Sequence, residues 1–329
     1  MTAEVFDCNW SGTDSTSVCV WRFLDGKAGH RNQVLGLTDA IGRIVQVDCH
    51  DIDVSRDLSG FKSLLPGCLR ALDHLPIPAL IVGAGHATHL PMLASRRRFG
   101  GRTIVLMKPS LPLFLFDMCL IPAADDLKRV PRNVIITEGA LNLIQPSETL
   151  ESQRGLILIG GPSSHFGWSD HDVLVQVKSV IESNPQIEWT LTTSRRTPTS
   201  FVAAWHASRC RGQMVPVDQT GSDWLPKQLK SAATVWVTNE SVSMIHEALT
   251  SGASVGILTL PESRRSRVTR GIDSLITRNL VTPFARWQAS SFVEGSGHTL
   301  DEAHRCAKLV AQTFLLQPDE SVMNQRRVA

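Results

Sequence analysis

The sequence of 329 residues has no tyrosine, and no run of about 18 apolar residues. Without tyrosine the chain cannot carry the Tyr-x-x-x-Lys pair of short-chain dehydrogenases, and without the apolar run no membrane-spanning helix is expected. The seven cysteines are scattered and include no Cys-x-x-Cys pair, which argues against a disulfide framework or a zinc site. Residues 1–17 lack the basic-then-apolar order of a secretory signal. These absences predict a cytoplasmic location, with attachment to a membrane surface left open.

Size and charge set two further expectations. A chain of 329 residues exceeds the usual length of a single hydrophobic core, so two domains are expected. Hydrophobic residues make up 42% of the sequence and charged residues 19%, as in an ordinary globular protein. The formal net charge of +2 is too small to favour a nucleic acid as partner.

Short β-branched runs alternate with amphipathic segments along most of the chain. This is the pattern of parallel sheets covered by helices. Two sets of six runs predict an α/β fold with two Rossmann-like, doubly wound parallel-sheet domains facing a cleft. The predicted strands are 18–24, 44–47, 79–82, 103–107, 118–121 and 134–137 in the first half, then 156–159, 188–193, 213–217, 234–238, 254–258 and 280–282 in the second.

The polar segment 145–154 predicts a linker between the domains. The N-terminal domain is therefore expected over 1–145 and the C-terminal domain over 155–298. Thr299-Leu-Asp-Glu302 is a capping box ahead of an apolar stripe, which predicts a helix within 299–329. Because this helix follows the last strand, we expect it to cross back to the first domain.

The segment 235–258 reads as a strand, a polar turn, a helix and a second strand. Val242, Ile245 and Leu249 form the buried stripe of the helix. The turn from Thr238 to Ser243 places hydroxyls and free N–H groups at the helix start, where an anionic group such as a nucleotide phosphate is stabilised. The alternative is a plain strand–helix–strand unit without a ligand.

The loop 192–198 carries two adjacent arginines just before a predicted helix. Thr197 and Pro198 are a suitable N-cap and first-turn pair, so a helix should begin there. Arg195 and Arg196 could then hold a diphosphate together with the helix N–H groups. The alternative is that both guanidinium groups are merely solvated.

A third polar loop, Asp25-Gly-Lys-Ala-Gly-His-Arg-Asn-Gln33, follows the first strand. Gly26 and Gly29 permit a close approach of backbone to ligand, and Lys27 adds positive charge. Asp25 and His30 are candidate proton acceptors. The loop matches neither the Walker motif nor the dinucleotide fingerprint, and a charged strand-to-helix turn is the alternative interpretation.

Two more glycine turns follow predicted strands. Gly160 and Gly161, in Ile159-Gly-Gly-Pro-Ser-Ser164, occupy the position in the second half that the Asp25 loop occupies in the first. Gly85 precedes His86 and His89, which are spaced for one helical face. No third ligand is spaced to complete a metal site with them, so hydrogen bonding at the cleft or helix capping is favoured over metal binding.

The segment Leu113-Phe-Leu-Phe116, which follows Pro112, is strongly apolar. Burial in the hydrophobic core is the favoured interpretation. An exposed patch for a lipid acceptor or a partner is the alternative.

Four motifs, in this order, resemble one family. They are Asp25-Gly-Lys-Ala-Gly-His-Arg-Asn-Gln-Val-Leu-Gly-Leu, Gly160-Gly-Pro-Ser, Thr193-Ser-Arg-Arg-Thr-Pro and Val237-Thr-Asn-Glu-Ser-Val-Ser-Met-Ile-His-Glu-Ala. The sequence is similar over most of its length to the mitochondrial-fission "elongate mitochondria" family, which has bacterial members and resembles the two-Rossmann-domain (GT-B) glycosyltransferases. The resemblance implies transfer of a sugar from a nucleotide-diphosphate donor, with no metal and no separate cofactor. Its alternative is a non-enzymatic adaptor that recruits a membrane-division partner.

By position, the resemblance also implies the site. Asp25 and His30 would lie where a catalytic base is expected, on the side of an unidentified acceptor that is free, lipid-linked or at a membrane surface. The sequence departs from the family's pattern at two positions. Glu240 stands where Asp is usual, and Arg31 stands where an acidic or neutral residue is common. Sugar, base and oligomeric state stay open. The implied donor residues are Gly160, Gly161, Ser163, Ser194, Arg195, Arg196, Thr197, Thr238, Glu240, Ser241, Ser243, Met244 and Glu247, and the implied acceptor-side residues are Gly26, Lys27, Gly29, Gln33, Gly85, His86 and His89.

Overall fold

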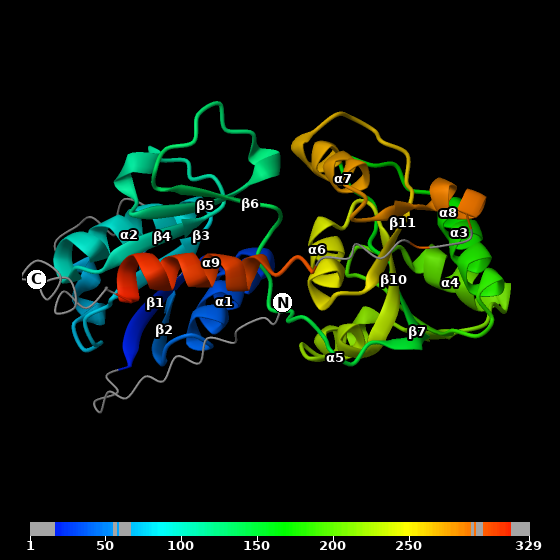
Figure 1. Ribbon diagram of the computed structural model, residues 1–329, viewed down its shortest axis with the longest axis horizontal. Helices are drawn as coiled ribbons and strands as arrows, with labels where there is room; N and C mark the ends of the chain where they lie inside the picture. The colour runs from blue at the N-terminus through cyan, green and yellow to red at the C-terminus, as the bar shows by residue number, and fades with distance from the viewer. Residues whose placement is uncertain (1–16, 55–57, 59–66, 291–292, 294–298, 317–329) are drawn as a thin grey trace, which may run out of the picture.

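Two six-stranded sheets, each wholly parallel, form the framework of the chain (Figure 1). The computed structural model describes residues 17–54, 58, 67–290, 293 and 299–316. The first sheet has the order β2-β1-β3-β4-β5-β6 and the second β12-β11-β10-β7-β8-β9. The strands of the first sheet are β1 (Val18–Leu24), β2 (Val47–Asp53), β3 (Leu80–Ala84), β4 (Arg102–Leu106), β5 (Met118–Pro122) and β6 (Val134–Thr137). Those of the second are β7 (Glu151–Leu158), β8 (Glu188–Thr192), β9 (Gln213–Val215), β10 (Ala232–Thr238), β11 (Ser254–Leu258) and β12 (Thr282–Pro283).

Helices pack on both faces of each sheet, and strands such as β3 and β11 are buried on two sides, as their apolar sequences require. In the first domain, α1 (Ala28–Gly42) and α9 (Glu302–Val310) pack on one face and α2 (His86–Phe99) on the other. In the second domain, α5 (Trp224–Ser231), α6 (Val242–Ser251) and α7 (Arg267–Thr277) pack on one face. The other face is covered by α3 (Asp170–Ser183), α4 (Thr199–Ser208) and α8 (Phe284–Ser290).

The predicted strand 44–47 is wrong by several residues. Residues 44 and 45 instead form the turn that follows helix α1, in which their N–H groups donate to the carbonyl of Ile41. Strand β2 begins at Val47, which pairs with Val18 of β1. The sequence of β2 is largely polar because it lies at the edge of the sheet, and this weakens the apolar signal that marks a strand.

Part of the predicted linker is also strand. Strand β7 begins at Glu151 and pairs with Ala232 of β10, although residues 151–154 are exposed. Residues 138–150 form the connection that lies between β6 and β7.

Helix α9 lies along α1 on the first domain (Figure 1). Cys306, Ala307 and Val310 are fully buried in the core that α1 and the first sheet share. At the start of α9, the carboxylate of Glu302 accepts a hydrogen bond of 2.9 Å from the backbone N–H of Glu138. The chain therefore passes twice between the domains, and both passages meet at residues 138 and 302.

Two ion pairs also bridge the domains. Arg267 of α7 contacts Asp125 at 2.9 Å, and Arg278 contacts Glu138 at 2.8 Å. In the described part of the chain, no helix is both long enough and apolar enough to cross a membrane.

Candidate functional site

A cavity of about 690 Å³ opens at the carboxyl ends of β7, β8 and β10. This is the edge of an open parallel sheet at which ligands bind. Its walls come from the second domain, except for Ala28 at the start of α1. The cavity therefore lies where the two domains meet. The other lining residues are Leu158, Ser163, His165, Thr192, Thr193, Ser194, Arg195, Arg196, Val217, Thr220, Trp224, Leu225, Glu240, Ser241, Val242, Ser243, Met244 and Val268.

The glycine turn after β7 is packed tightly behind this cavity. The N–H of Gly160 donates to the hydroxyl of Thr238 at 2.9 Å, and the N–H of Gly161 donates to Oε1 of Glu240 at 2.8 Å. A Cβ atom on Gly160 would lie 1.6 Å from that Oε1, and one on Gly161 would lie 2.2 Å from the carbonyl oxygen of Arg196. Only glycine permits this approach of three loops.

Glu240 has the most constrained side chain of the site. It has no exposed surface, and its Oε1 also accepts hydrogen bonds from the hydroxyl of Ser241 at 2.7 Å and from Arg196 at 3.3 Å. Its Oε2 is buried and has no hydrogen-bond partner in the described part of the chain. Burying a carboxyl group with one unsatisfied oxygen is energetically costly.

Helix α6 begins at the cavity without a side-chain cap. Ser241 is its N-cap residue, but the hydroxyl of Ser241 donates to Glu240 instead of capping the helix. The N–H groups of the first helical turn have no acceptor within the helix. Ser243 and Met244 of this turn line the cavity, and Ser243 is exposed. This arrangement can stabilise an anion.

The arginine loop forms the facing wall. Arg195 is exposed, lines the cavity and has no ion pair or hydrogen bond with another described residue. The predicted helix start is wrong by one residue: Pro198 is the N-cap of α4, and the helix begins at Thr199. The hydroxyl of Thr197 instead accepts from the N–H of Ser194 at 2.8 Å and faces the Gly160 carbonyl. Thr197 thus ties the arginine loop to the glycine turn.

An Asp–His pair stands in the first domain. Nδ1 of His30 lies 2.8 Å from Oδ2 of Asp25, whose side chain is 3% exposed. A Cβ atom on Gly85, which has a φ of +88°, would lie 2.4 Å from that Nδ1 and 2.7 Å from that Oδ2. The carboxylate fixes the imidazole ring, and in such a pair the other ring nitrogen can accept a proton. Ala28, between the two residues in sequence, lines the cavity.

The two histidines that follow Gly85 lie in different environments. His86 begins α2 and is exposed, whereas His89 is 3% exposed and its Nδ1 lies 3.2 Å from the hydroxyl of Ser110. Burial, and the charge of His86 to a smaller extent, lowers the pKa of His89 to about 4. His89 is therefore a neutral group of the protein interior. Among the described residues, no three His, Cys, Asp or Glu side chains are grouped to hold a metal ion.

Glu247 and His246 lie on the second turn of α6. Burial raises the pKa of Glu247 from an ordinary value of 4.5 to about 7. Burial also lowers the pKa of His246 to about 4, against a smaller opposing effect of Glu302. The His246 ring packs on Gly139, where a Cβ atom would lie 2.2 Å from it. The far side of α6 therefore contacts the passage between the domains.

The structure brings most of the predicted donor residues together. Gly160, Gly161, Thr197 and Thr238 lie directly behind the cavity wall through the contacts described above, whereas Glu247 is not in the lining. Asp25, in the turn that leads into α1, and His30, in the first turn of α1, also stand outside the lining. Gly26 and Lys27 belong to the same turn as Asp25, and Gly29 and Gln33 to the start of α1. The predicted donor residues that line the cavity are Ser163, Ser194, Arg195, Arg196, Glu240, Ser241, Ser243 and Met244.

Sequence reasoning missed the apolar wall of the cavity. Val217 and Thr220 follow β9, and Trp224 and Leu225 begin α5. These residues come after the carboxyl end of a strand, so the same rule that found the other loops would have indicated them. Their lack of charge or glycine hid them.

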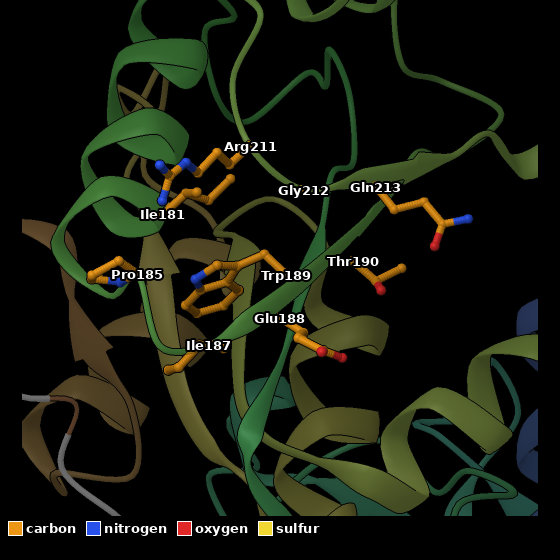
Figure 2. Close-up of a pocket in the computed structure, with 9 residues that line it drawn as sticks. All are labelled: Ile181, Pro185, Ile187, Glu188, Trp189, Thr190, Arg211, Gly212 and Gln213. Carbon is orange, nitrogen blue, oxygen red and sulfur yellow. The ribbon is translucent and has the colours of Figure 1, made fainter.

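A second cavity, of about 310 Å³, lies at the other end of the second sheet (Figure 2). Glu188 and Gln213, the first residues of β8 and β9, line it beside Trp189 and Arg211. The amino ends of parallel strands are not where such sheets bind ligands, so this cavity is not the candidate site.

Two doubly wound domains that meet at a cavity on the carboxyl edge of the sheet define a GT-B-like protein. MurG of Acinetobacter baumannii superimposes with a TM-score of 0.52 at 11% identity, covering 90% of this chain and 99% of that one. The UDP-GlcNAc 2-epimerase of Methanocaldococcus jannaschii gives 0.53 at 10% identity, with 90% and 99% covered. That of Neisseria meningitidis, bound to UDP-GlcNAc, gives 0.50 at 11% identity, with 91% and 99% covered.

The chain belongs to the mitochondrial fission ELM1 family, whose model matches residues 28–314. None of the curated proteins compared with the sequence matches it. At the identities given above, the structural likenesses show the fold alone.

Replacing Glu247 by Gln should remove a pH dependence of stability. The pKa of Glu247 is 4.5 in the unfolded chain and about 7 in the folded protein. Between these pH values the folded state binds more protons than the unfolded state, so stability falls as the pH rises from 4.5 to 7. The wild-type free energy of unfolding should therefore fall relative to the variant by on the order of 1–3 kcal/mol over this range. Urea unfolding at several pH values measures it.

His246 acts in the opposite direction, since its lowered pKa makes stability rise with pH between about 4 and 6.5. Subtracting the variant from the wild type removes this contribution. Glu188→Gln, at an exposed position, is the control. A difference between wild type and E247Q that stays constant across the range would contradict a raised Glu247 pKa.

Proposed function

We propose that the protein is a GT-B-like glycosyltransferase that uses a nucleoside-diphosphate sugar as donor. One observation carries the proposal: Arg195, which has no partner among the described residues, and the uncapped start of α6 line one cavity at the carboxyl edge of the second sheet. The Asp25–His30 pair of the first domain stands at the start of α1, whose first residue, Ala28, lines the same cavity. Family membership and fold agree with this function without specifying it.

The donor's diphosphate would lie between Arg195 and the first turn of α6. A guanidinium fork and free N–H groups together satisfy the oxygens of a diphosphate and stabilise the charge that develops as it leaves. No metal ion is part of this proposal. The nucleoside would lie against the apolar wall of Val217, Trp224 and Leu225.

Arg195→Ala should weaken the binding of UDP by roughly tenfold to a hundredfold, the value of a charge-assisted hydrogen bond. Calorimetric titration measures the dissociation constant. Arg211→Ala, at an exposed arginine that lines the other cavity, should leave it unchanged. If the wild type binds neither UDP nor GDP, the donor proposal fails.

In the transfer step, a hydroxyl oxygen of the acceptor attacks the anomeric carbon of the donor. The bond from that carbon to the diphosphate breaks, and the diphosphate leaves with the electron pair. The hydroxyl proton passes to His30, whose ring Asp25 orients and whose positive charge Asp25 then stabilises. Since neither side chain lines the cavity, the acceptor or a closing movement must bring the reacting groups together.

Asp25→Asn should lower the turnover of a UDP-sugar by about 10²–10⁴-fold, because the amide neither fixes the ring nor stabilises its charge. UDP release from a panel of UDP-sugars, with water as acceptor, measures the rate. UDP affinity should stay within about twofold, since Asp25 is outside the donor cavity. Asp48→Asn, in the exposed His50–Asp48 pair at 3.1 Å, is the matched control. Equal loss in both variants would remove Asp25 from the mechanism.

A second candidate function has one observation in its favour. The N–H of Gly161, the hydroxyl of Ser241 and part of Arg196 would suit a phosphate, but they are already bound to the chain's own Glu240. A scaffold that no longer binds a donor can fill its anion site in this way. This favours a non-enzymatic adaptor that recruits a membrane-division partner, in keeping with the family's description.

Glu240→Gln separates the two candidates. Under the glycosyltransferase proposal, the neutral amide frees Arg196 for the diphosphate and removes a like charge beside it, so UDP should bind roughly tenfold more tightly. Under the adaptor proposal, neither the wild type nor E240Q binds UDP. Calorimetric titration with UDP distinguishes the two outcomes. If E240Q instead bound UDP more weakly, Glu240 would be the residue that holds the N–H, hydroxyl and guanidinium groups in position to bind the phosphate.

A further inference from the structure

The first sheet is not covered by helices along its whole length. The connections β4–β5 and β5–β6 contain only short 3₁₀ turns, η3 (Leu113–Leu115) and η4 (Ala123–Asp125). Leu111, Leu113, Leu115 and Leu127 pack inward on the core cluster that α2 also covers. In Figure 1 these connections form the teal loops above β5 and β6. Two irregular segments therefore make this face of the molecule.

Two large apolar side chains on these connections point outward. Phe114 of η3 is 80% exposed and Val130 is 56% exposed. The side-chain amide of Asn133 donates to the carbonyls of Leu113 and Phe116, at 2.8 and 2.9 Å, so it ties the segment 127–133 to η3. Phe114 and Val130 thus project from segments that are held together. The apolar run 113–116, expected in the core, is buried only in part.

Three cations stand on the same segment as Val130. Lys128, Arg129 and Arg132 are exposed, and none has an ion pair or hydrogen bond with another described residue. The nearby carboxylates do not neutralise them: Asp117 is bound to Arg96 and Arg102, and Asp125 to Arg267. Asp126 of this connection is exposed and has no ion pair with another described residue. The surface is therefore cationic around two apolar tips.

We propose that this surface, formed by Phe114, Lys128, Arg129, Val130 and Arg132, binds an anionic lipid bilayer. Aromatic and aliphatic tips enter the interfacial layer while neighbouring cations meet anionic headgroups. A stable protein interface buries about 800 Å² per partner around an apolar core that is depleted in lysine, whereas this surface offers two apolar tips separated by cations. The proposal is independent of the glycosyltransferase site, because it uses none of its residues.

Sedimentation with lipid vesicles tests the proposal on the full chain. The wild type should bind vesicles of phosphatidylcholine that contain about a quarter phosphatidylglycerol, should bind pure phosphatidylcholine weakly, and should be released by salt. Phe114→Ser and Arg129→Glu should each weaken binding to the anionic vesicles by roughly tenfold. Both positions are exposed, so circular dichroism and the thermal midpoint should stay unchanged.

Two matched controls lie on the second domain. Val175→Ser removes a 47% exposed apolar side chain on α3, and Lys227→Glu reverses an exposed charge on α5. Both should bind anionic vesicles like the wild type. The proposal is overturned if the wild type binds no anionic vesicle, or if F114S and R129E bind as it does. Loss of a cellular protein partner from F114S, without any vesicle binding by the wild type, would make the surface a protein interface and also overturn it.

Discussion

The candidate site depends on one steric constraint, the absence of a side chain at Gly160 and Gly161. Any Cβ atom there would overlap the carboxylate of Glu240 or the backbone of Arg196. Because this space is free, the ends of β7, β8 and β10 converge, and the arginine loop reaches the start of α6. The cavity wall, the burial of Glu240 and the position of Arg195 all follow from this contact.

As a result, only some of the groups in the site that could bind an anion are already bound to another residue of the chain. The chain's own carboxylate occupies some of the groups suited to an anion, while Arg195 and the first turn of α6 stay unoccupied by other described residues. The oxygen Oε2 of Glu240 is buried and has no hydrogen-bond partner among the described residues, and burying such a group is energetically costly.

A second constraint joins the site to the rest of the molecule. Helix α6 starts at the cavity, and its next turn carries His246, which packs on Gly139 in the passage between the domains. Asn142 in the same passage donates to Thr250 near the end of α6 at 3.0 Å. A movement of α6 would therefore change the contacts with residues 139 and 142 in the connection between the domains.

The sequence predicted the elements whose signal is local. The strands around the site, the glycine turns and the loop with Arg195 could be found because buried parallel strands are continuously apolar and their carboxyl ends carry the polar loops. Prediction from the sequence failed for segments whose structure depends on the strands beside them in the sheet. The edge strand β2 is mostly polar, and the exposed start of β7 looks like a linker. The apolar wall with Trp224 has no motif, so it was overlooked.

By itself, then, the sequence determined two parallel-sheet domains, the order of their loops and the family to which the chain belongs. Tertiary structure alone decided that Glu240 binds Arg196, that His89 is buried and neutral, and that Phe114 faces outward. The physical reason is range. Backbone preference and apolar periodicity act between residues close in sequence, whereas burial, ion pairing and the pKa of a side chain depend on residues that only folding brings near.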